Sequence, residues 1–552
     1  MKAINFGSMK AFHFQLYATG LVLFLFPALY LCLATLFFTL GFSISGWSLF
    51  LTLLGAFALV YFTYRPQLTL LWGALSIGFI VLSFGICNTY FDVSFDGQWY
   101  HQDAVRLLKE GWNPIWDPAI STTKVSGLNA NYVNCYPKAA WVFQGGVFSL
   151  TDNIELGKGL HLLSLLSLAC LLFPLLQFRL KLPAFYSLLV TLMCCASTIT
   201  LGQIFSFYVD GILFSYLGIF LVLGLEYLEF DQGVFPWVLL SFVFLVNIKF
   251  TGLVYSLIFC VFGILFYGMK LRRIPWPLIG RVVVIVMTGV VVVGYPTYVR
   301  NSVEQGHPFF PILGKNNEGK AIAEVQYPQD FFQMNRFQKA WKAHASLPIY
   351  TDHDHPSVAK PLFTSSVINS SVPYYRNHQP VTMSPFGPIE AELWILFIPL
   401  LVLLALRRPS WKIWLLLAAL ILSILVQPEF WNLRYAPQLL FVVVLVCLSL
   451  LRDPLRWVQG SALVFILLFL GNGLITSYQN WQWVREKSIP LEQALLSLRG
   501  KQVALQRGWM NSFELKLAHY NITPIYRSIP NASYQAFPGD AFSGWKTIPK
   551  TP

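Results

Sequence analysis

The stretch FDVSFDGQWYHQDAVRLLKEGWNPIWDP, residues 91–118, is the first long polar interval in an otherwise apolar N-terminal region. It continues to NANYVNCYPK, residues 129–138, and lies between apolar runs that are long enough to cross a membrane. The interval carries the acidic residues Asp92, Asp96, Asp103, Glu110 and Asp117. We expect this polar loop to hold the chemistry of the chain.

Inside this loop, apolar residues recur with the period of an α-helix. They are Tyr100, Ala104, Leu107 and Leu108, and the polar residues Gln102, Arg106, Lys109 and Glu110 fall on the opposite side of the helical wheel. Such a pattern predicts an amphipathic helix suited to the headgroup zone of a membrane. Asp96, directly before the helix, would then lie at the membrane surface. Asp103, Glu110 and Asp117 are expected to be solvated or helix-surface charges.

The composition indicates a polytopic membrane protein. Of 552 residues, 56% are hydrophobic and 11% are charged, against about 25% charged in ordinary soluble proteins. The net charge of +13 forms no basic stripe, so it does not indicate nucleic-acid binding. Most of the eight cysteines lie in apolar segments, whereas Cys87 and Cys135 flank the polar loop and could form a disulfide.

We predict an all-α polytopic fold of about thirteen transmembrane helices. The expected spans are residues 15–40, 47–64, 68–88, 156–176, 184–202, 211–226, 234–247, 251–269, 277–298, 390–406, 411–427, 437–451 and 458–477. The apolar run at 137–150 is short and contains two glycines, so we expect an amphipathic juxtamembrane or re-entrant helix there.

The positive-inside rule sets the predicted orientation. With a cytoplasmic N-terminus, fourteen basic residues fall in inside turns and only Lys249 and Arg434 in short outside turns. The inside set is Lys2, Lys10, Arg65, Arg179, Lys181, Lys270, Arg272, Arg273, Arg281, Arg407, Arg408, Lys412, Arg452 and Arg456. Counting 137–150 as a span would reverse this bias, which argues against it.

In this orientation three polar regions face outward: the loop at 89–137, a long loop at 299–389 and the tail at 478–552. The expected domains are a transmembrane unit, residues 1–477, and an outer-face cap, residues 478–552. Within the tail, KQVALQ and ITPIYRSI resemble strands, so the cap is expected to be a small α/β segment. We predict a multi-pass protein of the cytoplasmic (inner) membrane, with its active site and C-terminus on the periplasmic side.

Three acids are candidates for catalysis. Asp96 precedes Gly97 and the amphipathic helix, so it could simply be an N-cap. Asp92 is the alternative, four residues earlier. Asp210, in GQIFSFYVDG, is either a turn-forming residue before Gly211 or a second functional acid.

Cations suited to phosphate collect on the same side. Lys249 in VNIKFTG and Arg434 in FWNLRYAPQLL, with Tyr435 beside it, lie at outward ends of spans. Arg300 and His307, in YVRNSVEQGHPFFP, follow another span. A lysine can snorkel to the interface and an arginine can anchor in headgroups, yet both also bind anionic lipid headgroups.

These residues indicate sugar transfer from a lipid carrier. The chain has no P-loop or dinucleotide-binding pattern for a nucleotide sugar, so a donor at the outer face would be a polyprenyl phosphate. A carboxylate would remove the proton of the acceptor hydroxyl, and Lys and Arg would stabilise the phosphate leaving group. We expect no obligatory metal or other cofactor.

The ordered motifs resemble GT-C glycosyltransferases that use polyprenyl-phosphate sugars, relatives of the aminoarabinose and protein O-mannosyl transferases. The motifs are DGQWYHQDAVRLLKEGWNP, YPK, NIKFTG, RNSVEQGHPFFP and LRYAPQLL, in the order of the family between about residues 90 and 440. The chain departs from the family pattern by placing three spans before the first loop, and it lacks a directly adjacent pair of acids there.

The resemblance implies an integral membrane glycosyltransferase of cell-envelope polysaccharide or lipopolysaccharide synthesis. It implies Asp96 as catalytic base, Asp210 as second acid, and Lys249 and Arg434 as phosphate contacts, with Arg300 as a further one. Tyr100, His101 and Lys138, which lie inside the matching motifs, are further site candidates. The implied partners are a polyprenyl-phosphate sugar such as an undecaprenyl phosphate, the bilayer, and a glycan, lipid or protein acceptor.

Two other functions are alternatives for this sequence. An O-antigen ligase or polymerase would act on diphosphate-linked glycans, and His353, His355 and His378 of the long loop are the residues that suggest it. A lipid-linked sugar transporter would place charges in the middle of its spans, whereas these segments are nearly free of charge.

Overall fold

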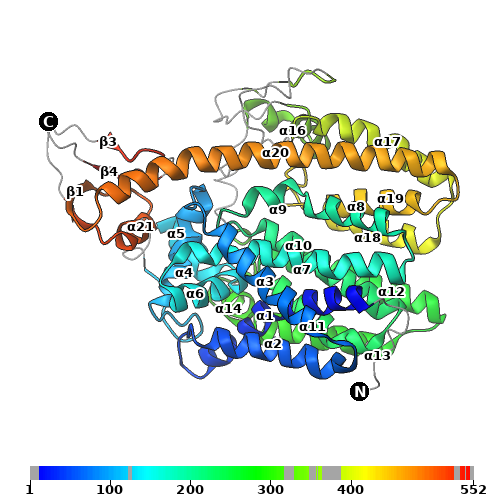
Figure 1. Ribbon diagram of the computed structural model, residues 1–552, viewed down its shortest axis with the longest axis horizontal. Coiled ribbons are helices and arrows are strands. Elements are labelled where there is room, and N and C mark those ends of the chain that lie inside the picture. Colours follow the sequence, from blue (N-terminus) through cyan, green and yellow to red (C-terminus); the bar gives the residue numbers. More distant parts are fainter. Residues whose placement is uncertain are drawn as a thin grey trace.

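The computed structural model describes residues 11–121, 127–315, 328–346, 356, 359–363, 387–526, 535–540 and 543–547. It is an all-α bundle with a small α/β segment at the C-terminal end, which confirms the predicted fold class. Figure 1 shows the long helices side by side, with the sheet and several of the short helices gathered at one end. His353, His355 and His378 lie outside the described residues.

All thirteen predicted apolar segments are helical, at least in part. The bundle comprises α1 (Ala11–Thr39), α2 (Ser48–Tyr64), α3 (Leu70–Cys87), α7 (Gly159–Pro174), α8 (Ala184–Cys195), α9 (Thr198–Gln203), α10 (Asp210–Glu229), α11 (Phe235–Val246), α12 (Phe250–Leu271), α13 (Trp276–Val286), α17 (Glu390–Leu406), α18 (Trp411–Leu425), α19 (Leu439–Leu451) and α20 (Arg456–Ser497). Short helices η1 (Arg65–Gln67), η4 (Leu175–Arg179), η5 (Gln232–Val234), η6 (Met287–Val292) and η7 (Tyr295–Val299) extend or join them.

Length separates these helices into two groups. Within the described residues, six are long and apolar enough to cross a membrane, and a seventh span arises if the bent pair Trp276–Val292 and Tyr295–Glu304 counts as one. Five shorter apolar helices have 10–17 residues, fewer than the roughly 20 that span a bilayer unaided. Six or seven of the thirteen predicted spans are therefore full-length membrane helices by this measure, and others are shorter helices.

The predicted polar loop forms short helices at one end of the bundle. They are η2 (Gly97–His101), α4 (Gln102–Lys109) and α5 (Gly127–Cys135), followed by α6 (Ala139–Thr151) and η3 (Ile154–Lys158). The run expected as a re-entrant or juxtamembrane helix is α6, which has 13 residues and is buried from Ala139 to Phe148. A side chain at Gly146 would lie 2.2 Å from the Tyr30 hydroxyl, so this glycine lets α6 pack directly on α1.

The apolar face of α4 is buried as predicted, but its polar face is not all solvated. Asp103 was expected to be a surface charge, and that prediction was wrong, because its side chain is fully buried. The reason is that α4 packs against α6, and Glu514 and Arg507 of the C-terminal segment lie close enough to influence its charge. Burial raises the pKa of Asp103 to about 7.

The C-terminal part begins inside a continuous helix. Helix α20 has 42 residues and passes the predicted domain boundary at 477 without a break. It leads to β1 (Gln502–Gln506), α21 (Phe513–His519), β2 (Thr523–Tyr526), β3 (Gln535–Ala536) and β4 (Lys546–Thr547). The sheet order is β2-β1-β4-β3, with β1 parallel to β2 and antiparallel to β4. The strands predicted from KQVALQ and ITPIYRSI are β1 and β2.

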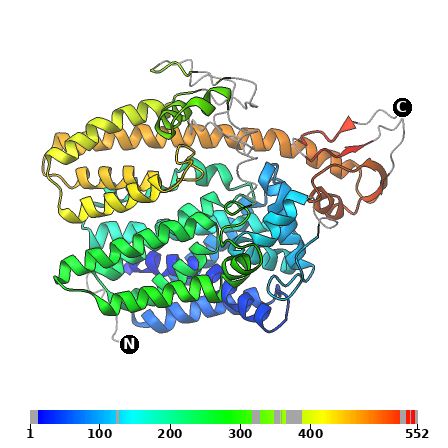
Figure 2. The ribbon, with the colours of Figure 1, turned by 180° about the vertical axis from the view of Figure 1, so that it is seen from behind.

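This α/β segment packs around a separate core, in which Leu491 and Leu495 of α20, Leu505, Phe513 and Trp545 are joined by Phe91 of the first loop. Figure 2 shows the segment from behind, at the same end as α4, α5 and α6. The long loop contributes α14 (Arg300–Glu304), η8 (Gln329–Gln333) and α16 (Arg336–His344). The arrangement places the first loop and the C-terminal segment next to each other.

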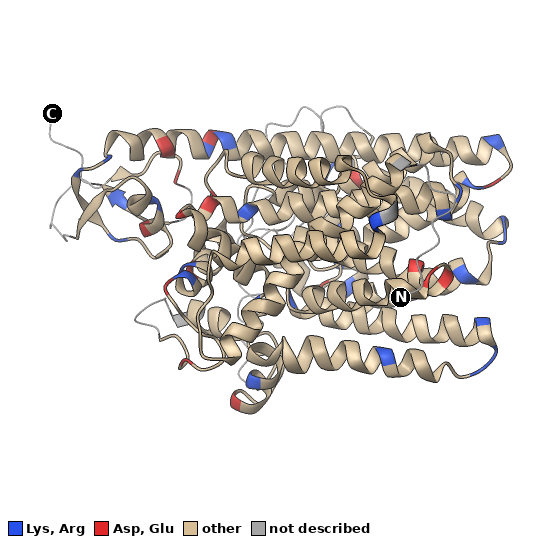
Figure 3. Ribbon diagram, turned by 60° about the horizontal axis from the view of Figure 1, so that its bottom comes forward, with Lys and Arg blue, Asp and Glu red and all other residues tan. Residues whose placement is uncertain are grey.

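Charged residues are concentrated near the two ends of the bundle. Figure 3 shows Lys and Arg in the turns at the end opposite the C-terminus, which is the end that the positive-inside rule assigns to the cytoplasm. The orientation in the membrane remains a prediction. All eight cysteines are free, so the disulfide considered between Cys87 and Cys135 is not present.

Candidate active site

Four charged side chains from separate parts of the sequence meet in one network. Arg434 donates from Nη2 to Asp96 Oδ2 at 3.0 Å and from Nε to Asp210 Oδ2 at 3.1 Å. Lys249 donates from Nζ to Asp210 Oδ1 at 2.6 Å. We call these residues the charged cluster. Two carboxylates thus balance two cations, and Arg434 links the two acids.

The four residues of the charged cluster come from four separate segments of the chain. Asp96 directly precedes η2, Asp210 is the first residue of α10, and Lys249 directly precedes α12. Arg434 lies in the turn between α18 and α19, 338 residues after Asp96. Because each residue stands at a helix end or in a turn, the bundle brings all four to one level.

Burial differs among the four side chains. Asp210 is 1% exposed and Arg434 8%, whereas Lys249 is 12% and Asp96 13% exposed. Asp210 is therefore enclosed by its partners, which also include the Gln203 amide at 3.0 Å. Asp96 and Lys249 are the members that a substrate could reach most directly.

The charges of the cluster are set by two opposing effects. Burial raises the pKa of Asp96 above its usual range, and the Arg434 guanidinium only partly offsets this. For Arg434, burial alone would lower the pKa, but the carboxylates of Asp210 and Asp96 raise it well above normal. Arg434 is consequently a permanent cation, and Asp96 is an acid whose charge is costly in this environment.

Aromatic rings line the cations. The Arg434 guanidinium lies 4.3 Å from the centre of the Tyr208 ring, and Lys249 Nζ lies 4.7 Å from that of Tyr435. Cations at such distances from a ring face are attracted by its quadrupole. Tyr435 was a predicted site residue and lies in the cluster, whereas Tyr208 and Gln203 were not predicted. Both belong to the same GQIFSFYVDG stretch as Asp210, and their polar side chains in an apolar turn were the available signal.

Close packing explains why a glycine follows both Asp96 and Asp210. A Cβ at Gly97 would lie 2.0 Å from Asp92 Oδ2 and 2.3 Å from Ser94 Oγ. A Cβ at Gly211 would lie 3.0 Å from Thr200 Cα and 3.2 Å from His161 Nδ1. Each Asp-Gly pair therefore allows a neighbouring segment to pack close behind the acid.

Asp96 and Asp92 have different surroundings. An N-cap was the alternative role for Asp96. The residue does stand at the N-cap position of η2, but its side chain makes no capping bond and binds Arg434 instead. The Asp92 side chain, fully buried, accepts hydrogen bonds from the backbone amides of Ser94 at 2.7 Å and Phe207 at 3.0 Å. Asp92 thus holds the loop against the segment before Asp210 and is not in the charged cluster.

Tyr100 and His101 lie on η2, on the buried side of the loop. The two rings are 4.1 Å apart, and His101 Nδ1 accepts a hydrogen bond from Trp141 Nε1 at 2.6 Å. Burial lowers the pKa of His101 to about 3, so the ring is neutral. Charges of the cluster influence both residues, but no direct bond joins them to it.

Three other predicted residues lie apart from the cluster and have other partners. Arg300 pairs with Glu304 at 2.8 Å and donates to the backbone carbonyl of Pro114 at 3.0 Å. His307 Nδ1 accepts from the amide of Phe309 at 3.1 Å. Lys138 donates to the backbone carbonyl of Asn134 at 2.7 Å, at the C-terminal end of α5, and burial lowers its pKa to about 7.

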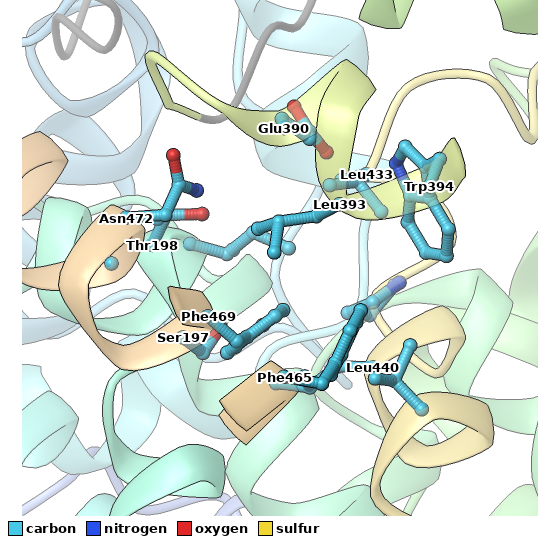
Figure 4. A pocket seen from close by; sticks show the side chains of 14 residues that line it. Ser197, Thr198, Glu390, Leu393, Trp394, Leu433, Leu440, Phe465, Phe469 and Asn472 are labelled. Atoms are coloured by element: carbon cyan, nitrogen blue, oxygen red, sulfur yellow. The ribbon is translucent and has the colours of Figure 1, made fainter. Parts of the chain in front are cut away.

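An apolar pocket is lined in part by the turn that carries Arg434. Figure 4 shows its wall of Leu393, Trp394, Leu433, Phe465 and Phe469, with Ser197, Thr198, Glu390 and Asn472 at the polar positions. Leu433 directly precedes Arg434, and Pro437 of the same turn also lines the pocket. An apolar space and a buried cation therefore share one turn of the chain.

Among known proteins, a likeness is found to solved structures. No family model matches the sequence, and no curated protein matches it either. Among solved structures, the chain is similar to the crystal structure of ArnT from Cupriavidus metallidurans bound to undecaprenyl phosphate. The two are 13% identical with a TM-score of 0.40, over 84% of this chain and 87% of that chain.

Proposed function

We propose that this protein is an integral membrane glycosyltransferase that moves a sugar from a polyprenyl-phosphate carrier to an acceptor hydroxyl. The observation that carries the proposal is the charged cluster, in which a partly exposed carboxylate lies 3.0 Å from a guanidinium. The turn that carries this guanidinium also lines an apolar pocket. This combination suits a substrate with an anionic head, an apolar tail and a transferable group.

Asp96 is the proposed general base. Arg434 binds Oδ2 of Asp96, which leaves Oδ1 to accept the proton of the acceptor hydroxyl. As the proton leaves, the hydroxyl oxygen of the acceptor attacks the anomeric carbon of the sugar. A positioned base of this kind typically contributes about 10²–10⁴-fold to the rate. Asp92 is less suited to the role, because both of its oxygens already bind backbone amides and the side chain is fully buried.

Lys249 and Arg434 are proposed to hold the phosphate of the carrier. As the glycosidic C–O bond breaks, negative charge develops on the phosphate, and fixed cations in a buried site stabilise it. Asp210 orients both cations through its two oxygens and is therefore a positioning residue. The pocket beside Leu433 would take the first part of the polyprenyl chain.

The test is a transfer assay on the purified protein with a panel of polyprenyl-phosphate sugars, measuring loss of sugar and release of lipid phosphate. Asp96→Asn should lower the rate by about 10²–10⁴-fold. Asp152→Asn is the matched control, because Asp152 is 88% exposed and lies outside the cluster. Near wild-type rates in both Asp96→Asn and Asp92→Asn would refute the assignment. Activity only with diphosphate-linked glycans would favour a ligase or polymerase instead.

A further inference from the structure

A line of aromatic rings leads from Asp96 to the C-terminal α/β segment. Phe95, the neighbour of Asp96, has its ring centre 5.5 Å from that of Trp99 and 5.3 Å from that of Trp509. Trp99 continues the line to Tyr132 at 5.6 Å. Trp509 comes from a part of the chain more than 400 residues later, so the fold places it here.

The C-terminal segment is held firmly at this position. Ser512 donates from Oγ to the backbone carbonyl of Gln98 at 2.6 Å, and Lys516 donates from Nζ to Gln98 Oε1 at 3.3 Å. Both donors are buried. Gln98 is two residues from Asp96, and Trp509 is three residues from Ser512. These bonds therefore hold the indole in place beside Phe95, the chain neighbour of the proposed base.

Trp509 is accessible, although it belongs to this contact. Its side chain is 46% exposed, and Phe95 and Trp99 are half-buried. An aromatic ring that only packs one segment on the other is usually buried between them, as Trp545 is in the core of the α/β segment. The exposed part of the indole therefore offers a surface to a ligand.

Groups that form directional hydrogen bonds lie near this ring in the chain. Arg507 pairs with Glu514 at 3.1 Å and donates to Asn511 at 3.3 Å, and Glu514 also accepts from the Tyr526 hydroxyl at 2.9 Å. Figure 1 shows this segment, with α21, next to α4 and α5. An exposed aromatic ring and hydrogen-bonding side chains thus belong to the same short segment, Arg507–Glu514.

We propose that Trp509, with Phe95 and Trp99, binds a sugar ring of the acceptor, so that the acceptor is a carbohydrate. This rests on the proposed function. A pyranose has one face of C–H groups, which carry slight positive charge and pack on the negative face of an aromatic ring. Its rim of hydroxyls can donate to and accept from Arg, Asn and Glu side chains. A lipid acceptor would need a continuous apolar surface instead of these hydrogen-bonding side chains.

The experiment measures binding directly, by saturation-transfer difference NMR on the purified full-length protein. The probes are methyl α-D-mannopyranoside, methyl β-D-glucopyranoside and methyl β-D-galactopyranoside, with the acyclic polyol sorbitol as a negative control. The variants are Trp509→Ala, Trp509→Tyr and Trp457→Ala. Trp457 is a matched control because it is 60% exposed and lies in the first turn of α20, far from Trp509.

We expect ring protons of at least one glycoside to be saturated by the wild type and by Trp457→Ala, and sorbitol not to be. Trp509→Ala should weaken glycoside binding about threefold to tenfold, as expected for one aromatic contact, and Trp509→Tyr should restore most of it. Equal saturation with Trp509→Ala, no saturation by the wild type, or equal saturation of sorbitol would overturn the proposal. Absence of lipid-phosphate release from every donor would refute the transferase function, whatever these binding results are.

Discussion

The two acids of the charged cluster should respond in opposite ways to loss of charge. Asp96→Asn removes a charge that burial disfavours, since the pKa of Asp96 is raised in the folded protein. The amide can still accept from Arg434, which also keeps Asp210. We therefore expect Asp96→Asn to be as stable as the wild type, or slightly more so, while transfer falls by about 10²–10⁴-fold.

Asp210→Asn should instead be inactive and less stable. Asp210 is 1% exposed and binds both Lys249 and Arg434, whereas Asp96 binds Arg434 alone. Neutralising Asp210 therefore leaves Lys249 without its carboxylate partner in the cluster. Removing one partner of a buried ion pair costs about 3–5 kcal/mol. With an unfolding entropy of about 2.1 cal/mol/K per residue, or about 1.2 kcal/mol/K for the chain, Tm should fall by about 3–4 °C.

The measurements are thermal unfolding of the detergent-purified variants and the sugar-transfer assay on the same samples, with Asp152→Asn as control. Arg434 and Lys249 stay in place in both variants, so the comparison isolates the two carboxylates. A fall in Tm for Asp96→Asn as large as that for Asp210→Asn would refute the reasoning, because it would mean that the ion pair with Arg434 outweighs the cost of burying Asp96.

Four further outcomes are expected. Lys249→Met should raise the Kd for polyprenyl phosphate at least about tenfold, because it removes one charge-assisted contact. Lys270→Met, at the other end of α12, is the control and should leave this Kd unchanged. Equal Kd values for Lys249→Met and the wild type would contradict the phosphate contact. The kcat/KM of transfer should fall as pH drops, with a midpoint higher than that of an exposed aspartate, because the base must be ionised and burial raises the pKa of Asp96. A profile that stays flat throughout the acidic range would argue against Asp96. Asp103→Asn should unfold at a higher temperature than the wild type at pH 8 and at the same temperature at pH 4. The reason is that a folded-state pKa of about 7 for Asp103 makes the wild type lose up to about 4 kcal/mol of stability as pH rises from 4 to 7. A stability difference that does not change with pH would exclude ionisation of Asp103 as its cause. Gly97→Ala should lose about 1–3 kcal/mol of stability, since its Cβ would lie 2.0 Å from Asp92, and Gly85→Ala, where nothing lies within 4 Å, is the control that should remain stable.

Local sequence patterns accounted for most of the fold. The apolar segments predicted the bundle helices because a helix buried in lipid or among other helices is apolar over long stretches. The alternation in KQVALQ likewise predicted β1. Helix length was harder to predict, since α20 continues for 42 residues across the change from apolar to polar sequence at which a boundary was expected.

The members of the charged cluster could be named from the sequence, but their partners could not. Asp210, Lys249 and Arg434 were singled out because charges are rare in short turns between apolar helices. Their pairing depends on how distant helices pack, for instance Arg434 against Asp96 across 338 positions. The same limit explains Asp103, whose helix has an amphipathic pattern and nevertheless buries part of its polar side, including Asp103. Arg300 and Lys138 look similar to Arg434 and Lys249 in sequence, yet they bind backbone carbonyls.

The distance along the chain between Asp96 and Arg434 has a consequence for biosynthesis. At about 5–20 residues per second, Arg434 leaves the ribosome roughly 20–70 s after Asp96, which lies 338 positions earlier. During that interval Asp210 can already pair with Lys249, 39 residues away, but Asp96 has no cation of its own in the cluster. A nascent chain that stops before Arg434 would therefore hold an incomplete site with one excess negative charge. The last helices to be inserted complete the site that the first polar loop begins.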